Sequence, residues 1–406
     1  EKRYPTRWDL DEVEGERPVI LTRICGHAAV LNSKALEEAG LLDEKLDSPH
    51  LWKGAGGEPT GIVAEKLLEL VENKFPTSAA LGDSLRHLQN GLLCCASKGV
   101  TTLGFVSCTL ESYRALQVLR REGKLLARVR VYMAADALGA LASLGVRGGY
   151  GDGMLKVAGI KAFADGSLGA RTAWLSFPYA DLPGESGGPL VGEEELARIV
   201  RSAEELDLQV ATHGIGDRAI DLILGAYGRA EGTKRLRHRI EHCSIVRGDQ
   251  IRRIKELGAA VTIQPRFAIS DWWVTSRIGM ERAKLAYPFK TLAGETDFVG
   301  IGTDCPVEPV DPWETVYAAA TRGALEGVPL GVETPEQRLT LEETLDKYTR
   351  GSAGAMNEEG ELGTLELGMY ADFVVLETDP FSIGAERVRD LKVSETYVGG
   401  NRTFPP

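Results

Sequence analysis

The sequence lacks the features that would place it in a membrane or in an oxidising compartment. No apolar run approaches the ~20 residues that a membrane-spanning helix requires. Only 6 of the 406 residues are cysteine, and none of them forms a Cys-x-x-Cys pair. A disulfide framework and a cysteine-rich zinc knuckle are therefore not indicated, and we expect a reducing, cytoplasmic location.

Basic residues are also fewer than acidic residues. The chain has 47 lysines and arginines against 59 aspartates and glutamates, which gives a formal net charge of −12. Because phosphate groups bind to basic surfaces, this balance argues against nucleic acid or an anionic membrane as a partner. The apolar fraction of 43% and the charged fraction of 26% are ordinary for a globular protein.

Short strand-like segments alternate with helical segments along most of the chain. Alternation of this kind predicts parallel β–α–β units that join in a right-handed sense. A closed (β/α)8 barrel has eight strands. The strand-like segments are seven, at 100–105, 128–133, 155–163, 208–212, 237–241, 259–264 and 298–302. The helices expected beside them cover 81–98, 110–122, 193–206, 217–229, 250–257 and 341–356.

Two regions depart from this alternation. The first 75 residues hold a strand-like segment at 19–24 and a stretch rich in glycine and charge at 53–58, which predict an insertion or lid. After Met356 the sequence changes to short strands at 372–376 and 394–399, with a turn between them. We therefore predict an α/β protein with three parts. These are a lid region with a lead-in helix at 1–98, a TIM-like (β/α)8 barrel of which seven strands are visible at 99–356, and a small β element at 357–406.

Candidate metal ligands stand at the carboxyl ends of the predicted strands. His213 and His242 end two consecutive strands, about one strand–helix unit apart in sequence. Lys161 lies near the end of an earlier strand, and Asp304 follows the last one. In a parallel barrel the carboxyl ends of all strands open onto one face, so these side chains should meet there.

Each of these residues also has a simpler explanation. A single histidine at a strand end is more often a hydrogen-bonded structural residue, and a single lysine is more often solvated or ion-paired. Two histidines together with an aspartate favour a metal site instead, because neutral imidazole and carboxylate are good ligands for zinc. A lysine ammonium has no lone pair for a cation, but an amine carboxylated by CO2 becomes in effect a long acidic side chain.

Several segments together resemble the amidohydrolase superfamily, in the branch of metal-dependent hydrolases that includes N-substituted formamide deformylases. The resemblance extends from about residue 5 to residue 398. Each motif is short, but their order and spacing are those of the family. The segments are GH at 26–27, NSKAL at 32–36, GVTT at 99–102, GIKAFADGSLGART at 159–172, HGIGDRAID at 213–221, RIEH at 239–242 and GMYADFVVL at 368–376.

The resemblance implies a role for each candidate ligand. Lys161 corresponds to a lysine that is carboxylated by CO2 and bridges two metal ions. His213 and His242 correspond to metal ligands, and Asp304 corresponds to an aspartate that binds metal and also moves a proton. The cofactor implied is one or two divalent ions, with zinc expected.

The resemblance also implies a substrate pocket and an assembly. His27 and Arg171 correspond to positions that line the pocket for a small-molecule substrate. The strands near the C-terminus correspond to part of a small β-sandwich that family members build from both chain ends. A homodimer is expected at the level of the family.

One element of the family pattern is missing from the sequence. The family's first barrel strand ends in His-x-His, which supplies two ligands of the more buried metal ion, and no His-x-His occurs in these 406 residues. Family members also carry some tens of residues before that motif. We therefore expect a truncated chain that lacks strand one, binds metal poorly as written and could be inactive.

Metal-assisted hydrolysis of a carbon–nitrogen bond is the function that these residues predict. The substrate would be an amide, a formamide or a cyclic amide. A divalent metal lowers the pKa of its bound water, supplies hydroxide and polarises the substrate carbonyl. Asp304 would accept the proton of the water and pass it to the leaving nitrogen, while Arg171 or His27 would hold a polar substrate group.

Two other classes of function are left open by the sequence. A non-catalytic barrel, or an inactive homologue with its metal site lost, is favoured by the missing His-x-His and opposed by the four ligand positions that are present. A metal-free glycosidase could use Glu241 and Asp304 as paired carboxylates at strand ends. Chelators would inhibit a metal-dependent hydrolase and leave such a glycosidase active.

Overall fold

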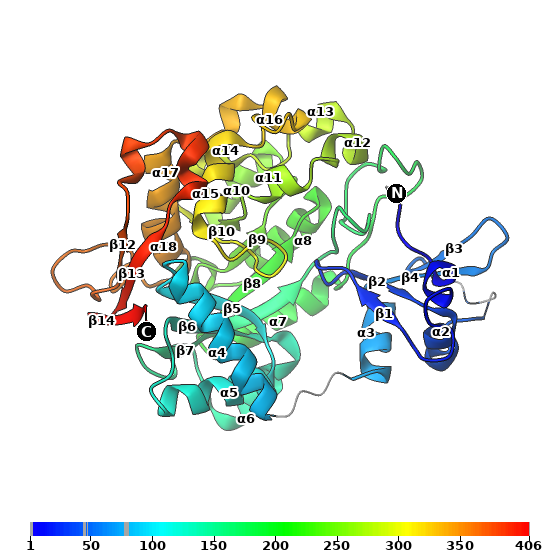
Figure 1. Cartoon of the computed structure of the whole chain (residues 1–406), viewed down its shortest axis with the longest axis horizontal. Helices are drawn as coiled ribbons and strands as arrows, with labels where there is room; N and C mark the ends of the chain where they lie inside the picture. The colour runs from blue at the N-terminus through cyan, green and yellow to red at the C-terminus, as the bar shows by residue number, and fades with distance from the viewer. Residues whose placement is uncertain (1–2, 44–45, 47, 77–80, 406) are drawn as a thin grey trace. The chain divides into compact units, whose positions relative to one another are not determined.

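The computed structural model describes residues 3–43, 46, 48–76 and 81–405 (Figure 1). The chain divides into two compact units, Glu1–Ala79 and Ala80–Pro406. The finer division into 1–98, 99–356 and 357–406 stays a prediction. None of the described helices is both long and apolar enough to cross a lipid bilayer.

The first unit is built on a small antiparallel sheet. Asn32 caps the helix that follows the second strand, since its side chain accepts a hydrogen bond from the amide of Ala35. The strand expected at 19–24 is present in a shorter form. The strands pair in the order β1-β2-β4-β3, with β1 at Ile20–Thr22, β2 at Ala28–Leu31, β3 at Leu51–Lys53 and β4 at Pro59–Ala64. The helices are α1 at Arg7–Asp11, α2 at Ser33–Ala39 and α3 at Lys66–Lys74.

The second unit is built on a curled sheet of parallel strands that forms a half-barrel (Figure 1). Within residues 81–405 this sheet has seven strands, which pair in sequence order from β5 to β11. The predicted strands and the predicted TIM-like α/β fold are confirmed. The strands are β5 Thr102–Cys108, β6 Arg128–Ala134, β7 Leu155–Phe163, β8 Gln209–Gly214, β9 Arg239–His242, β10 Ala260–Ile263 and β11 Phe298–Ile301.

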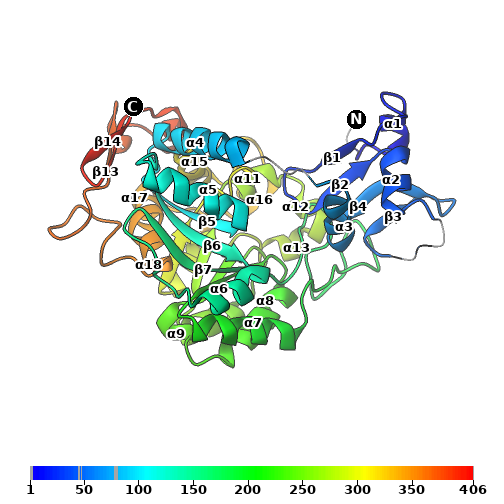
Figure 2. The same ribbon diagram turned by 90° about the horizontal axis from the view of Figure 1, so that it is seen from below.

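Helices cover this sheet, as the alternating pattern predicts, and α4 and α5 pack together beside β5 (Figure 2). The helix predicted at 341–356 is interrupted by a π-helical stretch at Lys347–Gly351. The helices are α4 Leu81–Ser97, α5 Leu110–Arg121, α6 Leu138–Leu144, α7 Glu193–Glu205, α8 Asp217–Gly228, α9 Thr233–Leu236, α10 Gly248–Leu257, α11 Phe267–Ser270, α12 Val274–Ile278, α13 Met280–Ala283, α14 Phe289–Glu295, α15 Pro312–Thr321, α16 Pro329–Glu333, α17 Leu341–Asp346 and α18 Ser352–Ala355.

A small antiparallel sheet follows α18, in agreement with the short strands predicted near the C-terminus. Strands β12 (Phe373–Leu376), β13 (Val393–Val398) and β14 (Asn401–Phe404) pair in chain order. The sheet packs against α4, where the hydroxyl of Thr396 donates to the carbonyl oxygen of Ala96 at 2.6 Å. The sequence did not predict β14, because this four-residue strand is mostly polar.

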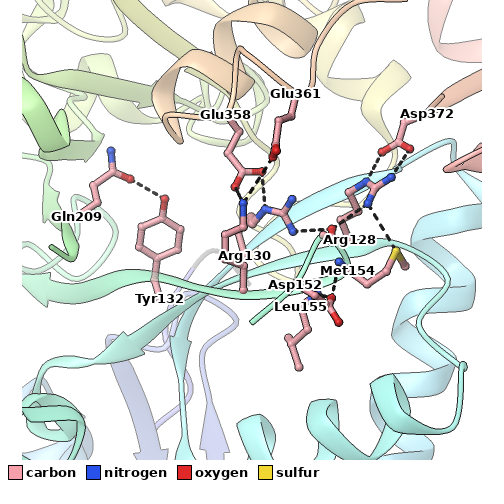
Figure 3. A network of polar contacts seen from close by, with 12 residues as sticks. Arg128, Arg130, Tyr132, Asp152, Met154, Leu155, Gln209, Glu358, Glu361 and Asp372 are labelled. Carbon is pink, nitrogen blue, oxygen red and sulfur yellow. Dashed lines mark hydrogen bonds and ion pairs between the residues drawn. The ribbon is translucent and has the colours of Figure 1, made fainter. Parts of the chain in front are cut away.

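Buried ion pairs join barrel strands β6 and β7 to the segment that leads into the C-terminal sheet (Figure 3). The guanidinium of Arg128 contacts both oxygens of Asp372, at 2.7 and 2.9 Å. Nε of Arg130, which is 0% exposed, lies 2.6 Å from Oε2 of Glu358. Lys156 donates to the other oxygen of Glu358 at 2.6 Å. One carboxylate therefore balances two cations inside the unit.

A glycine on β7 makes room for an aromatic ring inside the half-barrel. Gly159 pairs in register with Tyr132 of β6. A Cβ atom at Gly159 would lie 2.1 Å from the carbonyl oxygen of Gln209 and 2.7 Å from the Tyr132 ring. The hydroxyl of the fully buried Tyr132 donates to Oε1 of Gln209 at 2.5 Å (Figure 3). The close approach of these strands thus depends on the missing side chain.

We predict that Glu358→Gln lowers the free energy of unfolding by about 3 kcal/mol, because it leaves Arg130 and Lys156 without their shared counter-charge. Urea unfolding followed by circular dichroism measures the change. Glu361→Gln is the matched control, since Glu361 is half exposed and lies 3.6 Å from Lys156. The control substitution should lower the free energy of unfolding by less than about 1 kcal/mol. An equal loss of unfolding free energy in the two variants would show that the buried ion pair does not stabilise the protein more than the exposed one.

We predict that Gly159→Ala destabilises the protein by about 3 kcal/mol or prevents its folding, because the added methyl group overlaps a carbonyl oxygen and an aromatic ring. Gly139→Ala is the control, since a Cβ atom at this position in α6 meets no atom within 4 Å. Alanine favours a helix over glycine, so the control should be neutral or stabilising. Thermal unfolding distinguishes the two, and a fully stable Gly159→Ala protein would refute the packing argument.

Candidate metal centre

The structure brings the predicted histidine ligands together at the carboxyl ends of neighbouring strands. His213 lies on β8 and His242 ends β9, and the register pairs Gly214 with His242. The centres of the two imidazole rings are 4.6 Å apart, with the rings inclined at 68°. Lys161 lies near the end of β7, and Asp304 follows β11. All four predicted ligands are therefore on the carboxyl-end side of the sheet.

Each imidazole is oriented through one ring nitrogen. Nε2 of His213 lies 2.9 Å from the carbonyl oxygen of Gly166, which can only accept, so this nitrogen carries the proton. Nδ1 of His242 donates to Oε1 of Gln264 at 2.8 Å. In the neutral rings the lone pairs are then on Nδ1 of His213 and Nε2 of His242. Histidines that bind metal ions are typically oriented by such a second hydrogen bond.

Electrostatics favour the neutral form of His242. Burial lowers the pKa of His242 below its usual value, although the negative charge of Asp304 opposes this effect. A neutral ring at physiological pH is the form that can donate a lone pair to a metal ion. The side chain is therefore prepared as a ligand by its surroundings.

The backbone at two of the predicted ligands adopts an unusual conformation. The φ angle is 71° at His242 and 59° at Asp304. Residues other than glycine adopt this left-handed region at a cost of about 1–3 kcal/mol, and such strain is concentrated at functional sites. Strand alternation would send Glu241 and His242 to opposite faces of the sheet. The turn at His242 lets its ring approach His213 while Glu241 stays inside the half-barrel.

Lys161 is a buried amine without an ion-pair partner in the part of the chain that the structure describes. Its Nζ atom lies 4.5 Å from the centre of the Phe163 ring. Burial lowers the pKa of Lys161 to about 8, although the charges of Glu241 and Asp304 oppose this shift. A sizeable neutral fraction therefore exists just above neutral pH, and the neutral amine is the form that reacts with CO2.

Both carboxylate oxygens of Glu241 accept hydrogen bonds inside the half-barrel. Nε of Arg239 donates to Oε1 at 2.5 Å, and the hydroxyl of Thr262 donates to Oε2. Burial would raise the pKa of Glu241, but the charges of Arg239 and Lys161 hold it below the usual value. An ionised carboxylate that is occupied in this way is poorly suited to be a general acid, which argues against the glycosidase alternative.

The donor chemistry fits a divalent cation when Lys161 takes part. Among the residues that are described, no three His, Cys, Asp or Glu side chains are grouped so that they could hold a metal ion by themselves. His213, His242 and Asp304 offer the nitrogen and oxygen ligands that zinc prefers. The roles of Lys161 and Asp304 as ligands stay predictions.

The two predicted substrate-binding residues have charged partners of their own. Arg171 lies in the loop after β7 and donates to both oxygens of Asp181, at 3.2 and 2.8 Å. His27 belongs to the first unit, where its Nδ1 lies 3.1 Å from Oε2 of Glu65. The roles of Arg171 and His27 toward a substrate stay predictions.

The sequence did not reveal the residues that hold the predicted ligands in place. Gln264 follows β10 and orients His242. Asp165 follows β7 and accepts hydrogen bonds from backbone amides in the loops after β7 and β8, at 2.8 to 3.0 Å. The argument that singled out His242 could have found Gln264, since both stand at the carboxyl ends of neighbouring strands.

Comparison with known proteins agrees with this geometry. Residues 1–404 match the amidohydrolase family. The chain is 32% identical over 412 residues to the protein YtcJ of Bacillus subtilis (strain 168), covering 99% of this chain and 77% of that protein. It is 26% identical over 422 residues to the N-substituted formamide deformylase of Arthrobacter pascens, covering 98% of this chain and 76% of that enzyme.

A solved structure has the same fold. The crystal structure of an uncharacterized metal-dependent hydrolase from Pyrococcus horikoshii OT3 aligns with a TM-score of 0.78 at 39% sequence identity, over 94% of this chain and 76% of that one. These matches support hydrolase chemistry with a divalent metal. The chain therefore belongs to the amidohydrolase family.

Proposed function

We propose that this protein hydrolyses an amide, formamide or cyclic amide bond in a small molecule, with a divalent metal ion, zinc by preference, as its cofactor. The approach of the His213 and His242 rings to 4.6 Å carries this proposal. Membership of the amidohydrolase family supports the reaction class, and the relative named as an N-substituted formamide deformylase supports the formamide substrate. The acidic net charge supports a small molecule over nucleic acid as the partner. A cytoplasmic location and a homodimer belong to the same proposal.

Four side chains would hold the metal ion: Lys161, His213, His242 and Asp304. When bound, the metal would activate a water molecule and polarise the substrate carbonyl. Lys161 would contribute after carboxylation, in which its neutral amine attacks the carbon of CO2. The new N–C bond forms as one C–O π pair moves to oxygen, and the nitrogen releases a proton to solvent.

The chain's own residues would position the substrate and move the proton. Asp304 would accept a proton from the attacking water and then transfer it to the leaving nitrogen as the C–N bond breaks. Gln264 and the carbonyl of Gly166 would keep the two imidazoles in their ligand orientation. Arg171 or His27 would hold a polar group of the substrate.

We predict that Asp304→Asn retains the bound metal but loses about 100-fold or more of the turnover, because asparagine cannot accept and return the proton. A panel of amides, formamides and cyclic imides, with metal content measured by mass spectrometry, tests this. Asp297→Asn is the control, since Asp297 is an exposed carboxylate at the opposite end of the same strand. Unchanged turnover in Asp304→Asn would remove Asp304 from the mechanism.

We predict that removal of the metal with a chelator abolishes turnover and lowers the thermal midpoint, since a ligand that binds only the native state stabilises it. Zinc with bicarbonate should restore both properties more completely than zinc alone, because Lys161 needs CO2 to become a ligand. Turnover that persists after complete removal of metal would exclude a metal-dependent hydrolase. A protein that binds zinc but converts no substrate on the panel would favour the non-catalytic alternative.

A further inference from the structure

A buried turn follows β7 and contacts one of the predicted metal ligands. Residues 166–170 are buried, although they belong to neither a helix nor a strand. The carbonyl oxygen of Gly166 lies 2.9 Å from Nε2 of His213, and the same turn carries Arg171 in the left-handed conformation, with φ at 60°. Buried main-chain carbonyl oxygens need hydrogen-bond donors, because water does not serve them. The donors to this turn therefore bear on the position of His213.

Arg277 supplies two of these hydrogen bonds from another loop. It lies on α12, in the loop after β10, and its Nη1 donates to the carbonyl oxygens of Leu168 at 2.6 Å and Gly169 at 3.0 Å. Its side chain is 12% exposed, and its guanidinium carbon lies 4.7 Å from the centre of the Trp273 ring. One nearly buried side chain thus joins the loops that follow β7 and β10.

Asp181 contacts Arg277 and Arg171 at the same time. Its Oδ2 lies 2.8 Å from Nε of Arg277 and accepts a hydrogen bond from Nη2 of Arg171 at 2.8 Å. The main chain is joined as well, since the amide of Ala180 donates to the carbonyl oxygen of Arg277 at 2.9 Å. The planar guanidinium holds several acceptors in a fixed geometry, which a lysine cannot do. The loop after β7 is therefore tied to Arg277 both at its first turn and near its middle.

We propose that Arg277 and Asp181 are positioning residues, which fix the turn after β7 so that the carbonyl of Gly166 stays against His213. The inference rests on the proposed function, because it takes His213 to be a metal ligand. Without these contacts the turn could shift, and the His213 ring would lose the acceptor that orients it. A ligand whose outer hydrogen bond is lost binds a metal ion more weakly, because its ring must then be ordered on binding.

Arg277→Met tests the proposal, because methionine keeps an unbranched apolar stem and has no hydrogen-bond donor. Zinc affinity by chelator competition and hydrogen exchange of segment 166–173 by mass spectrometry are the two measurements, both made below the thermal midpoint of the variant. We expect the zinc dissociation constant to rise about 10- to 100-fold. The amides of Arg171, Thr172 and Ala173 donate to carbonyl oxygens within the turn and should exchange about tenfold faster.

Arg282→Met is the matched control. Arg282 lies on α13 in the same loop, and its Nη1 also donates to a carbonyl oxygen of the loop after β7, that of Pro178 at 2.7 Å. Because this contact lies beyond the turn at 166–173, its loss should change neither the zinc affinity nor the exchange of the turn. An equal effect of Arg282→Met and Arg277→Met would overturn the specific role of Arg277.

Asp181→Asn is the second variant, and it carries the test if Arg277→Met does not fold. Asparagine keeps the shape of the side chain and removes the charge that holds Arg277, so the zinc dissociation constant should rise by a smaller factor. In the double variant the two effects should be less than multiplicative, because both residues act through one contact. Arg277→Lys retains a cation beside Asp181 and should recover part of the zinc affinity that Arg277→Met loses.

The outcomes separate the positioning role from the proposed function. If the unaltered protein binds zinc while Arg277→Met and Asp181→Asn bind it equally well, the positioning role is overturned. A lower thermal midpoint with unchanged zinc affinity leads to the same conclusion, since the two residues would then serve stability alone. If the unaltered protein does not bind zinc, the proposed metal centre fails and this inference fails with it.

Discussion

Burial of charge inside the half-barrel is the constraint on which the rest of the second unit depends. A charged group in the interior is costly unless a counter-charge or hydrogen bonds compensate for the lost water. Arg130 is matched by Glu358, and Arg239 is matched by Glu241. Glu358, the partner of Arg130, follows α18 in the sequence. The ion pair therefore also ties the segment that leads into the C-terminal sheet to β6.

The candidate site follows from the same constraint. Lys161 is a buried amine that forms no ion pair within the described part of the chain. Burial lowers the pKa of Lys161 to about 8, and this residue lies near the carboxyl end of β7, as His213 and His242 lie near the carboxyl ends of β8 and β9.

The strand pattern was largely predictable because it rests on local signals. Short β-branched segments between amphipathic helices fix the parallel architecture, and each predicted strand lies within a few residues of its observed bounds. β14 escaped prediction because it is short and mostly polar, so it depends on pairing with β13. The π-helical stretch at Lys347–Gly351 likewise lies inside a segment whose sequence predicts one continuous helix.

The sequence by itself determined which residue types stand at the ends of the strands, and so placed Lys161, His213, His242 and Asp304 at one end of the sheet. Only the tertiary structure decided which nitrogen of each imidazole faces a hydrogen-bond partner, and which cation each buried carboxylate contacts. Gln264 and Thr262 acquire their roles from the register between strands that are distant in sequence. The hydrophobic pattern of a strand fixes which side chains face the core. Which polar side chains then meet across β9 and β10 depends on how the two strands pack together.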